Sequence, residues 1–190
     1  MRNRLMCALC AGAVVTVASI AGAQAAVTVI GSGAAQLCFQ AADEGQSSIE
    51  YLQYCNEALA GALSKDDRAA TYINRGVLEL LEMKVNAAQD DFNAGLALND
   101  GLGEGYVDRG ATLIAQKKYS EAIADINKGI SLGSKQPQLA YFDRAMANEA
   151  LGNLRAAYDD YRQSLVIAPD FTRASDELKR FKVVEKPSGV

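Results

Sequence analysis

The chain has 190 residues, with 19 basic and 23 acidic side chains, a formal net charge of -4 and no histidine. This length suits one ordinary domain or a short array of repeats. The absence of histidine excludes Ser-His-Asp and Cys-His catalysis and His-ligated zinc or haem, and the acidic balance argues against a nucleic-acid-binding protein.

Residues 1–25 predict a secretory signal peptide. Two arginines precede an apolar run over residues 5–20, and small residues with A-x-A cleavage sites follow over residues 21–26. The alternative is an uncleaved membrane anchor, because no charged residue occurs over residues 5–42. We therefore expect a periplasmic or secreted protein, which contacts a membrane only if the leader is retained.

The four cysteines divide into two pairs. Cys7 and Cys10 lie in the predicted leader and would leave with it. Cys38 and Cys55 remain, and an even number of cysteines in an exported chain favours one disulfide over two reduced thiols. This disulfide would close residues 33–64, which we interpret as a degenerate N-terminal helical hairpin.

Residues 69–169 contain an internal repeat. The block Tyr72-Ile73-Asn74-Arg75-Gly76 recurs in similar form from Tyr106 and from Tyr141, at offsets of 34 and 35 residues. Further blocks keep the same register and place small residues where two helices of a pair would approach. The pattern predicts three helix-turn-helix units, over 69–102, 103–137 and 138–169.

These blocks resemble the tetratricopeptide-repeat family, and with the leader they indicate an exported bacterial member of it. Matching positions of the family's pattern are occupied by Tyr72, Tyr106, Tyr141, Gly76, Gly110, Ala145, Ala88, Ala122, Ala157 and Pro169. The chain departs from the pattern at Glu79 and Asn148, where a large residue is usual, and only the third unit has the closing proline. The resemblance implies an all-α fold, a short right-handed α-solenoid.

A periodic pair of opposite charges accompanies the repeats. Each arginine of the first block is followed 16 residues later by an aspartate, and the pairs are Arg75 with Asp91, Arg109 with Asp125 and Arg144 with Asp160. The constant spacing predicts a repeated Arg–Asp bridge between helices. The alternative is two independently solvated charges.

The chain ends in a predicted capping helix over residues 170–183, followed by a tail over residues 184–190. One helical stripe carries the apolar residues Phe171, Ala174, Leu178 and Phe181, and charged residues fill the rest. A stack of repeats needs such a cap to cover its last apolar face.

The family's concave surface, built mostly from the first helix of each unit, is the candidate partner-binding site. In this register it comprises Ile73, Asn74, Val77, Leu80, Val107, Asp108, Ala111, Ile114, Phe142, Asp143 and Met146. The basic residues with which some family members grip a peptide carboxylate are absent from these positions. An apolar or mildly basic segment, such as an amphipathic helix, would fit this surface. The alternatives are that this stripe is internal packing or that the C-terminal helix covers it.

The sequence thus favours a non-enzymatic protein–protein interaction module of the periplasm or cell envelope. It predicts a protein or peptide partner and no catalytic residue, cofactor, metal, nucleic acid or small-molecule substrate. The alternative is a structural or assembly subunit that associates with itself through its ends. The sequence leaves the oligomeric state open.

Overall fold

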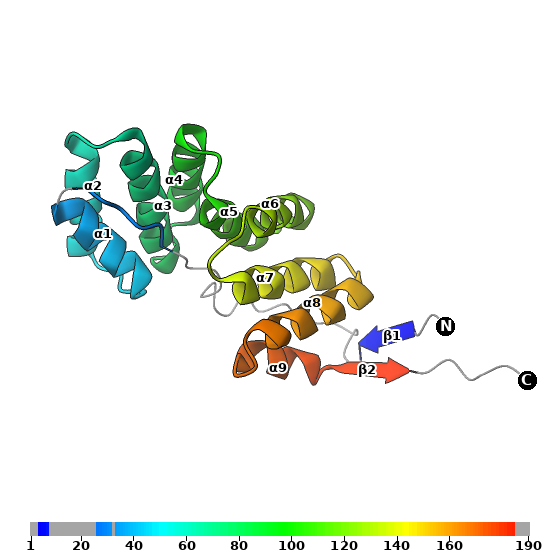
Figure 1. Cartoon of the computed structure of the whole chain (residues 1–190). Helices are drawn as coiled ribbons and strands as arrows, with labels where there is room; N and C mark the ends of the chain where they lie inside the picture. The colour runs from blue at the N-terminus through cyan, green and yellow to red at the C-terminus, as the bar shows by residue number, and fades with distance from the viewer. Residues whose placement is uncertain (1–3, 8–25, 32, 185–190) are drawn as a thin grey trace, which may run out of the picture.

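The structure is a computed structural model that describes residues 4–7, 26–31 and 33–184, and it is an array of helix pairs (Figure 1). The pairs are α1 (Gly33–Asp43) with α2 (Ile49–Ala60), α3 (Lys65–Leu81) with α4 (Val85–Leu98), α5 (Gly103–Ala115) with α6 (Tyr119–Ser131), and α7 (Pro137–Ala150) with α8 (Leu154–Ile167). The short helix α9 (Thr172–Leu178) packs on α8. Strands β1 (Arg4–Cys7) and β2 (Phe181–Val184) form an antiparallel pair.

The turn inside each of the three repeats has the same backbone geometry. Met83, Lys117 and Gly152 adopt φ values of 60°, 61° and 78°, so each turn passes through the left-handed region. The next residue donates its N–H to a carbonyl five residues earlier, as Asn153 does to Asn148. Glycine adopts this conformation without strain, and the third unit therefore has the residue best suited to the turn.

Small residues let the two helices of each pair approach closely. A Cβ placed on Gly76 would lie 2.7 Å from the ring of Phe92, and one on Gly110 would lie 2.5 Å from Ile126. The space next to each glycine is thus filled by the large side chain of the partner helix. This is the close approach that the repeated small residues predict.

The buried side chains form two clusters. The larger cluster takes in Ala26, Val27 and Val29 together with α1–α6, and it reaches α7 at Ala140. The smaller cluster joins α7, α8, α9 and β2 around Phe142, Tyr161 and Phe181. The array therefore has a main core and a separate core at its C-terminal end.

The C-terminal cap differs from the predicted helix over residues 170–183. The helix α9 ends at Leu178, and residues 181–184 continue as strand β2, which pairs with β1. The apolar stripe still covers the end of the array, because Ala174 is fully buried and Phe181 packs against Tyr158 and Tyr161. The extended form suits this stretch because it carries an aromatic and two β-branched residues.

The structure describes only parts of the predicted leader and of the predicted tail. Strand β1 falls within the predicted leader, and the rest of that leader lies outside the described residues. The predicted tail begins at Val184, the last residue of β2, and its remaining residues also lie outside them.

Candidate functional site

The first helices of the three repeats, α3, α5 and α7, line one side of the array, which we call the inner face. All eleven residues of the candidate partner-binding surface lie on these helices. Ile114 and Met146 are half-buried, and the remaining nine are buried. Most of the predicted surface is therefore covered by other parts of the chain.

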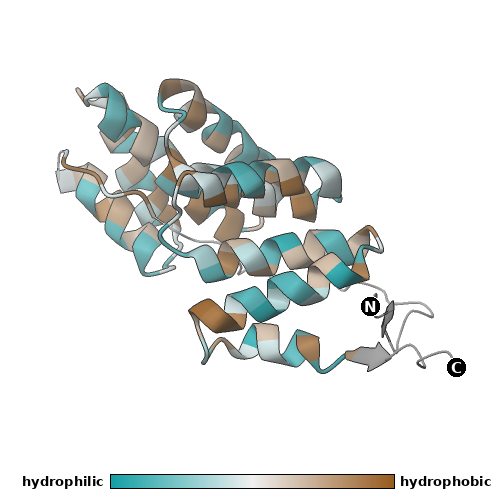
Figure 2. Cartoon of the chain, turned by 45° about the vertical axis from the view of Figure 1, so that its right-hand side comes forward, coloured by the Kyte–Doolittle hydropathy of each residue, from teal (hydrophilic) through white to brown (hydrophobic). Residues whose placement is uncertain are grey.

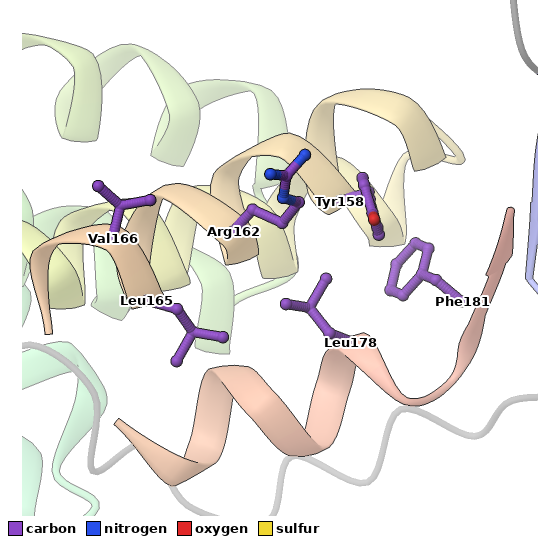
Figure 3. A pocket seen from close by; sticks show the side chains of 6 residues that line it. All are labelled: Tyr158, Arg162, Leu165, Val166, Leu178 and Phe181. Carbon is purple, nitrogen blue, oxygen red and sulfur yellow. The ribbon is translucent and has the colours of Figure 1, made fainter. Parts of the chain in front are cut away.

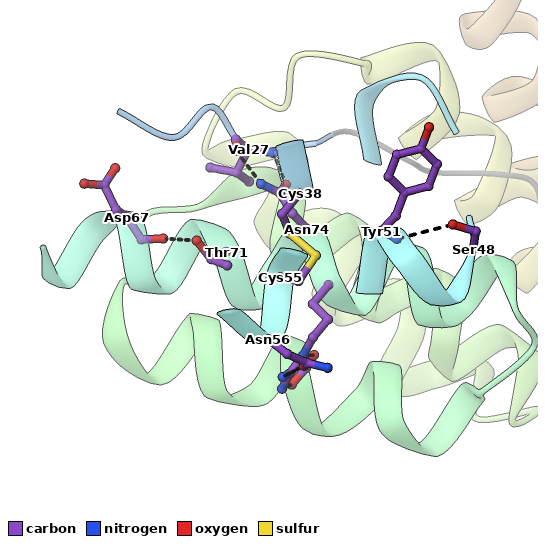
Figure 4. The surroundings of a disulfide bond; sticks show 11 residues. Val27, Cys38, Ser48, Tyr51, Cys55, Asn56, Asp67, Thr71 and Asn74 are labelled. Carbon is purple, nitrogen blue, oxygen red and sulfur yellow. Dashed lines mark hydrogen bonds and ion pairs between the residues drawn. A yellow bond between two sulfur atoms is a disulfide. The ribbon is translucent and has the colours of Figure 1, made fainter. Parts of the chain in front are cut away.

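Residues 26–31, which we call the strap, cover the first unit. The N–H of Val27 donates to Oδ1 of Asn74 over 2.7 Å, and Nδ2 of Asn74 donates to the carbonyl of Val27 over 2.8 Å. The N–H of Ile30 donates to Oδ1 of Asp67 over 2.9 Å. Figure 4 shows Val27 lying directly on Asn74, beside the disulfide. The strap thus occupies the inner face as an extended peptide would.

The side chains of the strap alternate between two environments. Ala26, Val27 and Val29 are buried in the main core, whereas Thr28 and Ile30 are exposed. Figure 2 shows the strap as a mostly hydrophobic segment crossing the helices. This alternation is that of an extended strand with one face in the core.

Helix α9 covers the third unit. The ring of Phe142 lies 5.3 Å from that of Phe171 in an edge-on arrangement, and the Arg173 guanidinium lies 4.4 Å from the Phe142 ring. Arg180, just beyond α9, pairs with Glu149 of α7. The sequence alternative in which the C-terminal helix covers the inner face therefore holds for the third unit, and the strap covers the first.

Asn74, Asp108 and Asp143 occupy equivalent positions in the three units. All three are buried. An amide both donates and accepts, so Asn74 satisfies the N–H and the C=O of one residue at once. Aspartate stands at this position in the second and third units, so neither of them offers the amide that holds the backbone in the first unit.

The buried carboxyl group of Asp143 has a perturbed pKa. Burial raises the pKa of Asp143 to about 7, and the positive charge of Arg173 opposes this rise. Its Oδ2 finds no hydrogen-bond partner among the described residues. The inner face of the third unit thus contains an acid whose charge is disfavoured.

The predicted Arg–Asp bridges are confirmed in all three units. Each arginine binds its aspartate through two nitrogens, and the N–O distances lie between 2.6 and 2.9 Å. A third nitrogen of each arginine binds an asparagine of the preceding helix pair, namely Asn56, Asn93 or Asn127. The ring of the tyrosine three residues before each arginine lies against its guanidinium group. The arginines therefore join neighbouring helix pairs. We call these arginines, with their aspartates and asparagines, the arginine row, and it is a structural feature rather than a binding site.

The sequence analysis did not predict two features, the asparagines of the arginine row and the packing of the strap on α3. The asparagines do recur in the sequence, because Asn93 and Asn127 are 34 residues apart. The alternation of the strap was also visible. Its position on Asn74 was not, because 47 residues separate Asn74 from Val27.

Cys38 and Cys55 form the predicted disulfide between α1 and α2. Both residues are fully buried, and their Cα atoms are 4.9 Å apart. The bond lies next to Asn74 and Val27 (Figure 4). It therefore fixes the helix pair that directly follows the strap.

A hollow lies at the C-terminal end of the array, between α8, α9 and β2 (Figure 3). Its volume is about 380 Å³, and it is lined by Tyr158, Arg162, Leu165, Val166, Leu178 and Phe181. Val166 is 70% exposed, and Ile167 beside it is 37% exposed. This end of the array thus presents apolar side chains to solvent.

The described residues contain no group of three or more cysteine, aspartate or glutamate side chains arranged to hold a metal ion. None of the helices described combines the length and the apolar character needed to cross a bilayer.

Solved structures with the same architecture were found by comparison. The TPR domain of Arabidopsis OM64 superposes with a TM-score of 0.59 at 23% identity, covering 62% of this chain and 96% of that domain. The second TPR domain of human RPAP3, in complex with an HSP70 peptide, gives 0.57 at 25% identity, covering 62% and 97%. MamA gives 0.60 at 17% identity, covering 74% and 80%.

No protein-family model and no curated protein matches the sequence. The structural matches nevertheless agree with the repeats in the sequence, and the resemblance to the tetratricopeptide-repeat family is confirmed. This chain has the tetratricopeptide-repeat fold, an all-α solenoid of helix-turn-helix units.

Proposed function

We propose that this chain is a non-enzymatic protein-interaction module of the periplasm or cell envelope, which binds a segment of a partner protein on its inner face. The observation that carries the proposal is the pair of hydrogen bonds between Asn74 and the backbone of Val27. A surface that holds one extended segment through its peptide groups has the chemistry to hold another. The solved structure of a RPAP3 repeat domain with an HSP70 peptide supports the same kind of partner.

The location rests on the predicted leader and the disulfide. Disulfides persist in oxidising compartments, such as the periplasm and the cell exterior. Cys38 and Cys55 are joined in the structure, and they remain in the chain after the predicted processing. Proteolytic removal of the leader and export can both be tested by fractionating cells and sequencing the N-terminus of the recovered protein.

Affinity capture from an envelope extract tests the proposed function. Ile114→Asp and Met146→Asp place a charge at the two half-buried positions of the inner face. We expect both variants to lose a partner that the unaltered chain retains. Val166→Asp, on the exposed surface of α8, is the matched control and should retain it. Equal capture by all four proteins would show that the partner does not contact the second and third units, and capture that Asn74→Asp also leaves unchanged would refute binding at the inner face.

The second candidate is an assembly subunit that associates with itself through its C-terminal end. The exposed Val166 and Ile167, beside the hollow between α8 and α9, favour it. Light scattering over a range of concentrations separates the two functions. An assembly subunit would grow in size with concentration, and Val166→Asp would prevent the growth. A constant monomer size would leave the interaction module as the better account.

A further inference from the structure

The strap is held mainly through its backbone. Three of its polar contacts with α3 use peptide N–H or C=O groups, namely those of Val27 with Asn74 and that of Ile30 with Asp67. One further contact, from Nζ of Lys135 to the Thr28 hydroxyl over 3.4 Å, involves a strap side chain. Recognition through peptide groups does not depend on the sequence of the bound segment.

The strap side chains that matter are small and apolar. Val27 and Val29 point into the main core with 8% and 4% of their surface exposed, and Ile30 is 88% exposed. The surface therefore requires two inward side chains of about this size, separated by one residue. Any extended segment that meets this requirement can make the same contacts.

Asn74 has the properties of a binding residue more than those of a core residue. Its side chain is fully buried, and both of its hydrogen bonds go to Val27. In the structure the strap satisfies both the acceptor and the donor of this buried amide. A peptide that replaced the strap would have to present the same pair of N–H and C=O groups.

We infer that the strap is a displaceable internal ligand, and that partners of this chain bind at the first unit as extended segments with alternating small apolar residues. The inference rests on the proposed function and makes it specific. It replaces the amphipathic helix expected from the sequence with an extended strand. A partner binds only when its segment displaces residues 26–31, so the strap sets the affinity threshold.

A labelled peptide with the sequence of the strap, Ala-Val-Thr-Val-Ile-Gly, is the probe. In the variant with Val27→Asp and Val29→Asp, two charges face the core, and we expect them to expel the strap. Fluorescence anisotropy should show that this variant binds the peptide at least tenfold more tightly than the unaltered chain. Adding Asn74→Asp, which removes the amide donor while keeping the shape, should abolish the gain.

The matched control puts a charge of the same sign on the exposed position between them, as Thr28→Asp, where it faces the ammonium group of Lys135. The strap should then stay in place, and the peptide should bind as weakly as to the unaltered chain. Equal binding by the two charged variants, or binding that survives Asn74→Asp, would overturn the inference. Circular dichroism checks that the variants are folded, and hydrogen exchange at the backbone amides of residues 27 and 30 reports directly whether the strap is in place.

The same proteins separate this inference from the proposed function. If the inner-face variants lose a captured partner but expelling the strap leaves its affinity unchanged, the function stands and the strap inference fails. If the peptide binds as expected but no captured partner depends on the inner face, the strap is a displaceable ligand and the proposed binding of a partner protein fails.

Discussion

The arginines of the repeated row combine charge with fixed geometry. Arg109 binds Asp125 through Nε and Nη2 at 2.7 and 2.9 Å, and it binds Asn93 of the preceding pair at 3.0 Å. Lysine keeps the positive charge but cannot make these three bonds in a plane. We expect Arg109→Lys to lower the free energy of unfolding by about 1–2 kcal/mol, measured by urea denaturation.

Arg155→Lys is the control for this substitution. Arg155 pairs with Asp159 one turn along α8, and its side chain is 62% exposed. Exposed pairs of this kind contribute little, so the change should leave the urea concentration at the unfolding midpoint almost unaltered. A loss of stability as large as that of Arg109→Lys would show that the planar set of three bonds is not what makes the arginine row stabilising.

Asp143 makes stability depend on pH. Burial raises its pKa to about 7, whereas an aspartate in an unfolded chain titrates near 4. Between about pH 4 and pH 7 the folded state holds a proton that the unfolded state has lost, so stability falls as the pH rises. Asp143→Asn removes this penalty. It should change little at pH 4 and stabilise the protein at pH 8 by up to about 4 kcal/mol.

The difference in the free energy of unfolding between Asp143→Asn and the unaltered chain reports on this carboxyl group alone, because the other acids titrate in both proteins. Asp90→Asn, on the exposed side of α4, is the control and should give the same small difference at both pH values. A constant difference for Asp143→Asn across the range would mean that the carboxyl group is charged in the folded protein.

At the scale of elements, the disulfide joins α1 and α2, the helix pair that lies outside the three sequence repeats. Cys38 and Cys55 are 17 residues apart, and closing a loop of this size is worth about 3 kcal/mol on the chain-entropy model. We expect Cys38→Ala with Cys55→Ala to destabilise the protein by about this amount. The loss should fall on α1 and α2, which hydrogen exchange can resolve.

Reducing agent provides the control for the disulfide. It should destabilise the unaltered chain and leave the double alanine variant unchanged. If the two proteins unfold at the same urea concentration before reduction, the bond contributes nothing to stability.

The sequence predicted the repeated elements well and the terminal ones less well. Tyr72, Gly76 and their counterparts recur at a fixed spacing, and each recurrence supports the others. The strap and β2 occur once, so no repeat supports them. Their places depend on contacts between distant residues, such as Val27 with Asn74, which a local pattern does not contain. The inner-face positions were identified by register, but register does not show what covers them.

At the scale of the molecule, the two cores imply two regions of unequal stability. In an array each unit contacts only its neighbours, so a defect in one unit spreads weakly to distant ones. Tyr161 is 1% exposed in the smaller core, where its ring lies 5.4 Å from that of Phe142. Replacing a buried aromatic residue by alanine costs about 3–5 kcal/mol. Tyr161→Ala should therefore speed hydrogen exchange in α7, α8 and α9 and leave α3 and α4 protected.

Phe92→Ala is the reciprocal variant, because Phe92 is fully buried in the main core and packs on Gly76. It should open α3 and α4, together with the strap that lies on α3, and leave α8 and α9 protected. Mass spectrometry of exchanged peptides resolves these regions in one experiment. If either variant accelerated exchange evenly along the chain, the array would unfold as one cooperative unit. In that case a partner bound at the first unit would stabilise the C-terminal end as strongly as its own site. With two regions, such a partner would protect α1 to α4 and leave α9 to open at its own rate.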